Sequence, residues 1–393
     1  MSVDVVIVAA KRTPMGSFQG QFAGVSATDL GATAIKACLD EVPQISGGDV
    51  DEVRMGCVLP AGLGQAPARQ ASLKAGLPVS VGCDTVNKMC GSGMKAVMLA
   101  YDQIKAGTAN IMVAGGLESM TNAPFLLPKA RGGMRMGHGE VLDHMYTDGL
   151  QDVTEGHLMG VFAERCAEKY GFTREAQDAF AIESVNRAIA ATKDGLFADE
   201  IAPVTVKTRK GETTYSDDEQ PLKADTSKIP KLRAAFKDGG TVTAANASSI
   251  SDGASAVLMM SAAAAEEKGV RPLAKIVAHS THSQEPAWFT TAPGPAIQKV
   301  LDQAGWSVGD VDLFEVNEAF ANVAMVAIED LKLDHAKVNI NGGACALGHP
   351  VGSSGSRIIA TLIHSLIRTG GVKGVAALCI GGGEGTAIAL EII

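Results

Sequence analysis

A single cysteine marks the most distinctive stretch of the chain. Cys90 lies in the segment Asn-Lys-Met-Cys-Gly-Ser-Gly over residues 87–93, and apolar residues then recur every three or four positions over 94–104, which predicts a helix. Cys90 therefore precedes a helix start, where unpaired backbone N–H groups and the helix dipole favour a thiolate. The alternative is an ordinary cysteine that acts as a small buried hydrophobic residue.

Three further residues could complete a reaction centre with Cys90. Asn317 follows the apolar stretch 311–316, His349 lies in a glycine-rich loop over 341–352, and Cys379 lies near the end of the apolar stretch 375–380. A histidine beside a thiol can take its proton and make it a nucleophile, and a second thiol can move a proton in another step. The glycines at 381–383 leave backbone amides free to line a site. Each residue alone is more often structural, so the hypothesis requires all four to lie together.

The elements that must position these residues occur twice. The turn Gly-Asp-Val-Asp and the strand after it, at 48–56, return at 309–316, and the helix, glycine and apolar strand that follow Gly93 return after Gly355. Alternating strand and helix patterns predict an α/β protein. Two matches in the same order favour an internal duplication. The duplication places the loop of His349 opposite the loop of Cys90, at the interface between the two halves.

Bulk composition limits the possible classes of protein. With 393 residues the chain is long for one core, which predicts two or three domains. Its formal net charge of -9 argues against nucleic acid or an anionic membrane as a partner. Seven cysteines without a Cys-x-x-Cys pair indicate neither a zinc site nor a disulfide framework. We therefore expect reduced thiols, a cytoplasmic location and no membrane association.

The composition changes between the two halves. Residues 120–245 are rich in proline and glycine and show one clear helix, over 176–192. Within 207–237 there are eight basic residues against five acidic ones, so this stretch is a candidate site for a phosphorylated ligand; a solvated surface is the alternative. The eight basic residues are Lys207, Arg209, Lys210, Lys223, Lys228, Lys231, Arg233 and Lys237, and a second basic group consists of Lys129, Arg131 and Arg135.

Four of these segments together resemble the catalytic loops of the thiolases. They are 87–93, Asn-Glu-Ala-Phe at 317–320, Gly-Gly-Ala-Cys-Ala-Leu-Gly-His-Pro at 342–350 and Cys-Ile-Gly-Gly-Gly at 379–383. The resemblance spans essentially the whole chain. It implies an α/β thiolase fold, with two duplicated βαβαβαββ halves in a five-layer αβαβα arrangement and an inserted loop domain. We expect the N-terminal half at 1–119 plus 246–270, the loop domain, with coenzyme A contacts and a tetramer loop, at 120–245, and the C-terminal half at 271–393.

The resemblance also implies a reaction, in which the chain is most similar to thiolases with acetyl-CoA C-acetyltransferase activity. His349 would take the proton of Cys90, whose thiolate would accept an acetyl group from acetyl-CoA. Cys379 would remove an α-proton from a second acetyl-CoA, and the carbanion would attack acyl-Cys90 to give acetoacetyl-CoA, with thiolysis as the reverse. The N–H groups of Cys90 and Gly381 would bind the oxyanion, and a water held by Asn317 would bind the enolate oxygen together with His349.

The same resemblance assigns a coenzyme A channel and an assembly. Some thiolases have an arginine near the adenine at the position of Pro221, and here Lys223 is the candidate replacement. We expect no metal and no redox cofactor, coenzyme A thioesters as substrates, a role in fatty acid metabolism, and homodimers that pair into homotetramers through a loop at 124–145. The expected channel residues are His157 or Met159, Lys223, Phe236, Ala244, Ser248, Ala319 and Phe320.

Three other functions remain open at this point. A degradative 3-ketoacyl-CoA thiolase (acetyl-CoA C-acyltransferase) of broader chain length would use the same residues. A non-catalytic protein that binds coenzyme A or lipid would bind without thiolysis. A cysteine hydrolase would need Cys90 and His349 but would have no use for Cys379.

Overall fold

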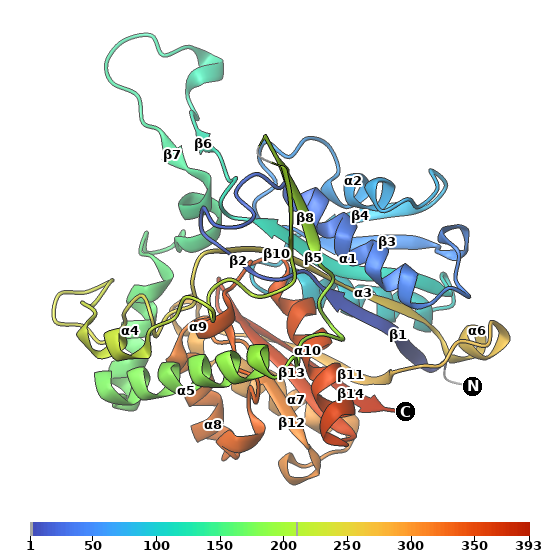
Figure 1. Cartoon of the computed structure of the whole chain (residues 1–393). Coiled ribbons are helices and arrows are strands. Elements are labelled where there is room, and N and C mark those ends of the chain that lie inside the picture. The colour runs from blue at the N-terminus through green and yellow to red at the C-terminus, as the bar shows by residue number, and fades with distance from the viewer. Residues whose placement is uncertain (1–2, 210) are drawn as a thin grey trace.

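The computed structural model describes residues 3–209 and 211–393 and shows two similar halves with an extended middle region (Figure 1). The N-terminal half combines the first strands and helices with one strand that returns after the middle region. Its elements are β1 (Val5–Arg12), β2 (Gly16–Ser17), α1 (Ala27–Glu41), β3 (Glu52–Gly56), α2 (Pro67–Lys74), β4 (Gly82–Val86), α3 (Ser92–Lys105), β5 (Ile111–Ser119), β10 (Ser251–Ser261) and α6 (Ala262–Glu267).

The C-terminal half repeats this pattern and ends the chain. Its elements are β11 (Ala274–Ser283), α7 (Pro293–Ala304), β12 (Leu313–Val316), α8 (Ala321–Leu331), α9 (Ala344–Leu347), α10 (Ser354–Thr369), β13 (Lys373–Ile380) and β14 (Glu384–Ile392). The described strands of both halves form one path, β12-β13-β14-β11-β1-β10-β5-β3-β4, with β2 paired to β10. Only two residue pairs join β1 to β11, so the path divides there into two sheets.

The fold has five layers of helices and sheets, and three buried apolar clusters lie where these layers pack together. α1 and α2 cover the outer face of the N-terminal sheet, α3 and α10 lie between the sheets, and α7 and α8 cover the outer face of the C-terminal sheet. The strands alternate between these layers, as side chains on a strand must. In β1, Val6 and Val8 face α1 whereas Val5 and Ile7 face the central helices. This arrangement confirms the predicted five-layer αβαβα fold.

Matched turns show the duplication at the level of single hydrogen bonds. Each half has a 3-10 turn closed by a capping box, η1 (Gly47–Asp49) in the first half and η6 (Val308–Asp310) in the second. An aspartate two residues after each turn accepts two backbone N–H groups at the entry to the neighbouring parallel strand. Asp51 does so before β5, and Asp312 does so before β13. These contacts set the start of the strands that lead to the site.

The two central helices approach each other closely at their first turns. A Cβ at Gly355 would lie 2.4 Å from the backbone nitrogen of Met94, and one at Gly93 would lie 2.7 Å from Ser356 Oγ. Only glycine leaves room for this approach. The crossing brings the loop before α3 and the loop before α10 together, which is the juxtaposition that the duplication predicts.

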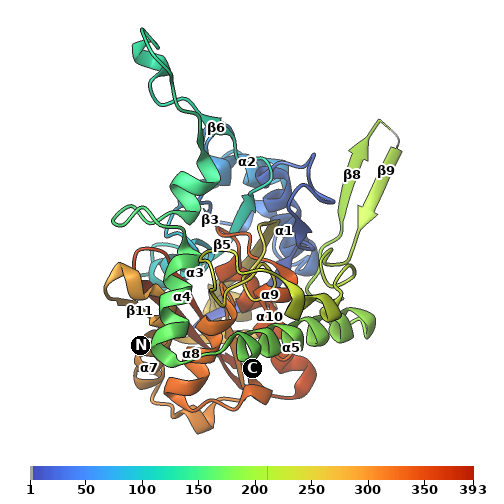
Figure 2. The same ribbon diagram turned by 90° about the vertical axis from the view of Figure 1, so that its left-hand side faces the viewer.

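The middle region packs beside the C-terminal half and sends out two hairpins. α4 (Met159–Tyr170) and α5 (Arg174–Lys193) both contact α8. The excursion between β6 (Phe125–Leu126) and β7 (Leu142–Asp143) extends far from the body in Figure 1, and the hairpin of β8 (Val204–Thr208) and β9 (Gly211–Tyr215) projects in Figure 2.

One helix of the middle region differs from the sequence prediction. Helix α4 is present although only α5 was expected in this region; its N-cap, Leu158, makes no side-chain hydrogen bond and Gly160 follows at the second position, so the usual start signals are absent.

Candidate active site

Cys90 lies two residues before α3 in a tight turn that its own neighbours hold in place. Met89 has a φ of +48°, in the left-handed region that side chains rarely adopt. The hydroxyl of Ser92 accepts the N–H of Lys88 (2.9 Å) and donates to the carbonyl of Met89 (2.6 Å), while Asn87 Oδ1 accepts the Met89 N–H (3.0 Å). The position of Cys90 is therefore fixed by local hydrogen bonds.

The environment of the Cys90 sulfur keeps it protonated at neutral pH. Burial raises the pKa of Cys90 to about 11, whereas hydrogen bonds from the N–H groups of Gly381 and of Cys90 itself act in the opposite direction. A thiol with this pKa needs a base to become a nucleophile. The two N–H groups that converge on the sulfur are also the kind of donors that stabilise a thioester oxyanion.

His349 is a base of suitable form. Its Nδ1 lies 2.5 Å from Ser354 Oγ, and the Ser354 hydroxyl lies 3.1 Å from the Pro350 carbonyl oxygen, which can only accept. When Ser354 donates to Pro350, Nδ1 donates to Ser354 and Nε2 carries the lone pair. Nε2 is buried without a hydrogen-bond partner among the described residues. Burial and the charge of Arg357 lower the pKa of His349 to about 3, so the ring is neutral and Nε2 keeps its lone pair.

Cys379 lies behind the wall that contains Gly381. It is fully buried near the end of β13, in an apolar cluster with Phe289, Ala319 and Phe320. Burial raises the pKa of Cys379, and electrostatic interaction with Cys90 raises it further. Two residues later, Gly381 donates to the Cys90 sulfur. The end of β13 therefore brings the second thiol close to the first.

Asn317 follows β12 and is buried beside the same strand end. Its backbone N–H donates to the carbonyl of Ala377 (2.9 Å), two residues before Cys379. The side-chain Oδ1 lies 3.5 Å from Arg357 Nη2, whereas Nδ2 has no partner among the described residues. A buried amide group without a partner is costly, so Asn317 has a donor available for a water or a ligand.

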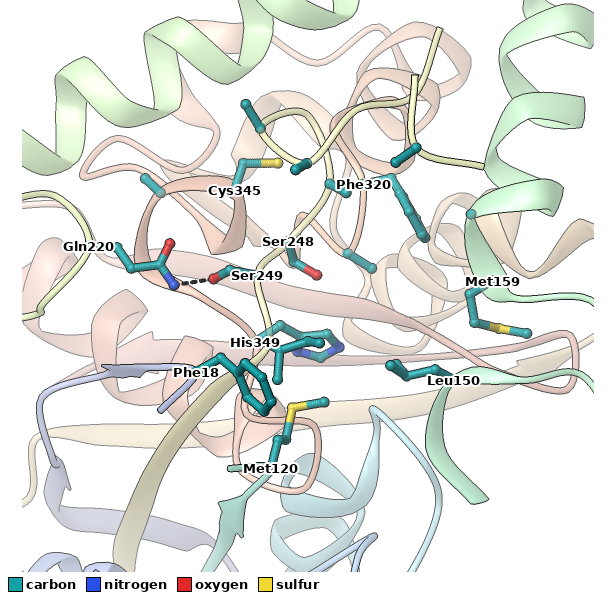
Figure 3. Close-up of a pocket in the computed structure, with 18 of the residues that line it drawn as sticks. Phe18, Met120, Leu150, Met159, Gln220, Ser248, Ser249, Phe320, Cys345 and His349 are labelled. Carbon is teal, nitrogen blue, oxygen red and sulfur yellow. Dashed lines mark hydrogen bonds between the residues drawn. The ribbon is translucent and has the colours of Figure 1, made fainter. Parts of the chain in front are cut away.

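A cavity of about 750 Å³ lies between the two halves and the middle region. Figure 3 shows the His349 ring with Met120, Leu150 and Met159 around it. Its mostly apolar walls with few polar groups are typical of a small-molecule site. Of the predicted residues, the cavity is lined by Cys90, Met159, Lys223, Phe236, Ala244, Ser248, Ala319, Phe320, His349 and Gly381.

Three predicted residues do not line the cavity. Cys379 and Asn317 are buried next to it, as described above. His157 is exposed and its ring packs edge-on against Phe162. Of the two residues that the sequence left open, Met159 lines the cavity and His157 does not.

The predicted basic stretch is only partly at the cavity. Lys223 and Lys228 line it and pair with Glu219 and Asp225. Lys207 lies on the exposed β8–β9 hairpin, and Lys210 lies outside the described residues. The second basic group lies in the β6–β7 excursion and is exposed: Lys129, Arg131 and Arg135.

Sequence reasoning missed several residues of the site. Gln220 and Ser249 are hydrogen-bonded to each other in the cavity wall (Figure 3). Ser354 positions His349, and the duplication could have indicated it, because Ser92 and Ser354 are the first residues of the two central helices.

The arrangement suits covalent transfer of an acyl group. It combines a thiol, a neutral imidazole base, a second thiol and two convergent N–H donors. Within residues 3–209 and 211–393, no cluster of histidine, cysteine or carboxylate side chains could hold a metal ion. None of the helices in that part of the chain is long and apolar enough to cross a membrane.

Comparisons with known proteins identify the family. The family model "Thiolase, N-terminal domain" matches residues 5–263, and "Thiolase, C-terminal domain" matches 270–392. An acetyl-CoA acetyltransferase of Pseudomonas aeruginosa is 51% identical over 98% of this chain and 99% of the relative, and one of Schizosaccharomyces pombe is 50% identical over 100% and 99%. The crystal structure of the Bacillus anthracis acetyl-CoA acetyltransferase superposes with a TM-score of 0.97 at 40% identity, covering 100% of this chain and 99% of that one. The chain therefore belongs to the thiolase family.

Proposed function

We propose that the protein is an acetyl-CoA C-acetyltransferase, which condenses two acetyl-CoA molecules to acetoacetyl-CoA and CoA and catalyses the reverse thiolysis. The observation that carries this proposal is the cavity that Cys90, Gly381 and His349 line together, with His349 Nε2 buried and without a partner among the described residues. Full-length relatives at about half identity are named acetyl-CoA acetyltransferase, which supports the same assignment.

In the first half-reaction Cys90 becomes acetylated. His349 Nε2 takes the thiol proton as the sulfur attacks the carbonyl carbon of acetyl-CoA, and the N–H groups of Cys90 and Gly381 stabilise the oxyanion. The C–S bond to coenzyme A then breaks, and the departing thiolate takes the proton back from the imidazolium. The acetyl group remains on Cys90.

In the second half-reaction a carbon–carbon bond forms. Cys379, as thiolate, removes an α-proton from a second acetyl-CoA, and the enolate oxygen is stabilised by His349 and by a water held on Asn317 Nδ2. The carbanion attacks the acetyl carbonyl on Cys90, and the thiolate of Cys90 leaves. This thiolate then takes the α-proton that Cys379 holds, which returns both sulfurs to the states in which the cycle began. Acetoacetyl-CoA is released. The raised pKa values of both thiols make each a strong base once it is deprotonated.

Coenzyme A would lie along the cavity with its thioester at Cys90. The apolar walls at Phe236, Ala244 and Phe320 suit the pantetheine arm, and Ser248 offers a hydroxyl beside it. Lys223 and Lys228 line the cavity in the middle region and are candidates for the phosphates.

A degradative 3-ketoacyl-CoA thiolase is the second candidate. The apolar side chains Met120, Leu150 and Met159 around His349 (Figure 3) could accommodate a longer acyl chain. Steady-state thiolysis of acetoacetyl-CoA and of a ten-carbon 3-ketoacyl-CoA separates the two. We expect a higher kcat/KM for acetoacetyl-CoA, and a strong preference for the longer substrate would overturn the assignment. Binding of coenzyme A without thiolysis would indicate a non-catalytic protein, and peptidase activity blocked by iodoacetamide would indicate a hydrolase.

We further infer homodimers that pair into homotetramers, in the cytoplasm and in fatty acid metabolism. The β6–β7 excursion supports the assembly, because it exposes large apolar side chains that a monomer gains nothing by exposing; they are Phe125, Leu127, Met134, Met136 and Val141. Free cysteines throughout the described residues support a reducing compartment. Sedimentation of the intact protein and of a form with this excursion shortened would test the tetramer.

A further inference from the structure

Glu118 is a buried carboxylate near the end of β5 whose role the mechanism leaves unexplained. Its Oε2 accepts the N–H groups of Val58 and Gly352 (both 2.9 Å), and its Oε1 accepts the N–H of Leu59 (3.1 Å) and faces the thiol of Cys57 (3.6 Å). Val58 and Leu59 follow β3 in the N-terminal half, whereas Gly352 belongs to the loop of His349 in the C-terminal half. One side chain therefore joins the two halves at the site.

No cation compensates this carboxylate. Within the described part of the chain no ion pair involves Glu118, and backbone N–H groups are its main partners. Burial raises the pKa of Glu118 to about 7, and the hydrogen bonds act in the opposite direction. An unpaired buried carboxylate is costly for a fold, so its presence here calls for a function.

The groups that Glu118 holds surround the nucleophile. Val58, Leu59 and Val351 form a buried cluster against which Met89 and Cys90 pack. Val351 lies between His349 and Gly352, so the contact with Gly352 also fixes the loop that carries the base. The space is tight, because a Cβ at Gly352 would lie 2.7 Å from Glu118 Oε2. Movement of the Glu118 carboxylate would therefore move the Val58–Leu59 segment and the Gly352 loop that surround Cys90.

We propose that Glu118 is a positioning residue that holds the Val58–Leu59 segment and the Gly352 backbone in register around Cys90 and His349. This inference deepens the proposed function and rests on it. It assigns to Glu118 no contact with the substrate, since Glu118 does not line the cavity. Its carboxylate acts through the backbone segments that it joins.

The charge of Glu118 has a second consequence for Cys90. The negative charge disfavours the thiolate and contributes to the raised pKa of Cys90. An ionised Glu118 therefore acts in the same direction as burial, which is the larger cause of the raised pKa of Cys90. Removal of the charge lowers the pKa of Cys90, so alkylation of the thiol extends to lower pH.

Glu118→Gln tests both parts, because it keeps the shape but removes the charge and places an N–H donor against N–H donors. We expect kcat for condensation to fall about tenfold to a hundredfold, as small misplacements of reacting groups do, with KM for acetyl-CoA little changed. The pH profile of Cys90 alkylation by iodoacetamide, followed on the peptide by mass spectrometry, should move to lower pH. Glu118→Asp keeps the charge, but its shorter side chain moves the carboxylate oxygens away from the N–H groups of Val58, Leu59 and Gly352. Its kcat should fall, whereas the pH profile of alkylation should not move.

Asp252→Asn is the matched control. Asp252 is a buried carboxylate on β10, opposite Ser119, that accepts the N–H of Thr121 (3.0 Å), and among the described residues its hydrogen bonds do not include Val58 or Gly352. Its kcat and alkylation profile should match the wild type. The inference would be overturned if Glu118→Gln had the kcat and the alkylation pH profile of the wild type. A variant that lost only thermal stability would contradict it in the same way. If the wild type itself forms no acetoacetyl-CoA, the proposed function fails, and the alkylation profiles still test Glu118.

Discussion

The two halves begin their central helices in the same way but place different residues before them. Ser92 starts α3 and Ser354 starts α10, and two residues earlier lie Cys90 and Gly352. In the first half the sulfur of Cys90 receives the N–H of Gly381. In the second half the N–H of Gly352 donates to Glu118. The duplicated frame thus offers two equivalent positions, and only one of them carries a cysteine.

The difference shows how a symmetric frame supports an asymmetric reaction. In the proposed reaction the first half supplies the sulfur that would hold the acyl group, and the second half supplies the proposed base His349, the second thiol and Gly381. Both halves are needed for one site, which lies where the central helices cross. The comparison predicts that changes at corresponding places in the two halves will have different consequences.

Cys379 should show the largest difference, because the matching strand β5 contains no cysteine. Cys379→Ala removes the base for the α-proton but leaves Cys90, His349 and Gly381 in place. Condensation should therefore fall about 10²–10⁴-fold, the usual contribution of a positioned proton transfer, while labelled acetyl-CoA still acylates the enzyme. Rapid-quench labelling and steady-state condensation measure the two steps.

Cys166→Ala is the control for loss of a buried sulfur. Cys166 lies on α4 and is buried outside the cavity wall, so both steps should match the wild type. If Cys379→Ala also loses acyl uptake, or retains condensation, the division of roles between the two thiols is wrong.

A substitution where α3 and α10 cross should give the next largest effect, a loss of stability. A Cβ at Gly355 meets backbone of α3 at 2.4 Å, with no flexible side chain to move away, whereas a Cβ at Gly132 meets nothing within 4 Å. We expect Gly355→Ala to lower the free energy of unfolding by about 1–3 kcal/mol or more, and Gly132→Ala to leave it nearly unchanged. Urea unfolding of both variants measures the difference. Equal stabilities would mean that the central helices can separate without cost.

Much of the fold could be predicted, because the periodicity of apolar residues and the spacing of glycines specify the helices and strands. The alternating strands, the helix after Gly93 and its repeat after Gly355 all follow from periodicity, and the duplication then brings Cys90 and His349 together. Helix α4 could not be predicted in this way, since Leu158 gives it no capping side chain. Its formation depends on packing against α8, which sequence periodicity does not specify.

The contacts that position the site residues could not be predicted from the sequence, for a related reason. Glu118 meets the backbone of Gly352, 234 positions away, and Lys88 pairs with Glu384 across the same interface. Nothing in the residue types at these positions indicates which N–H group or charge they will meet after folding. The residue types of the candidate catalytic groups are recognisable in the sequence, whereas the buried groups that hold them become identifiable only from the contacts.

The two first-turn serines should give the smallest and most specific difference. Ser354→Ala removes the acceptor for Nδ1 of His349, so that neither ring tautomer is preferred, whereas Ser92→Ala removes the support of the Met89 turn. Loss of one buried hydrogen bond costs on the order of 1–3 kcal/mol, so we expect kcat of Ser354→Ala to fall about tenfold. Ser365→Ala, at a buried serine on α10 that contacts Asn341, is the matched control.

The readout that separates the two serines is the alkylation of Cys90. Ser92→Ala loosens the turn that places the sulfur against the N–H groups of Cys90 and Gly381, so the alkylation profile should shift to higher pH as these hydrogen bonds weaken. Ser354→Ala leaves those donors in place and should lower kcat without shifting the profile. The opposite pattern would mean that the first turn of α10, and not that of α3, controls the thiol.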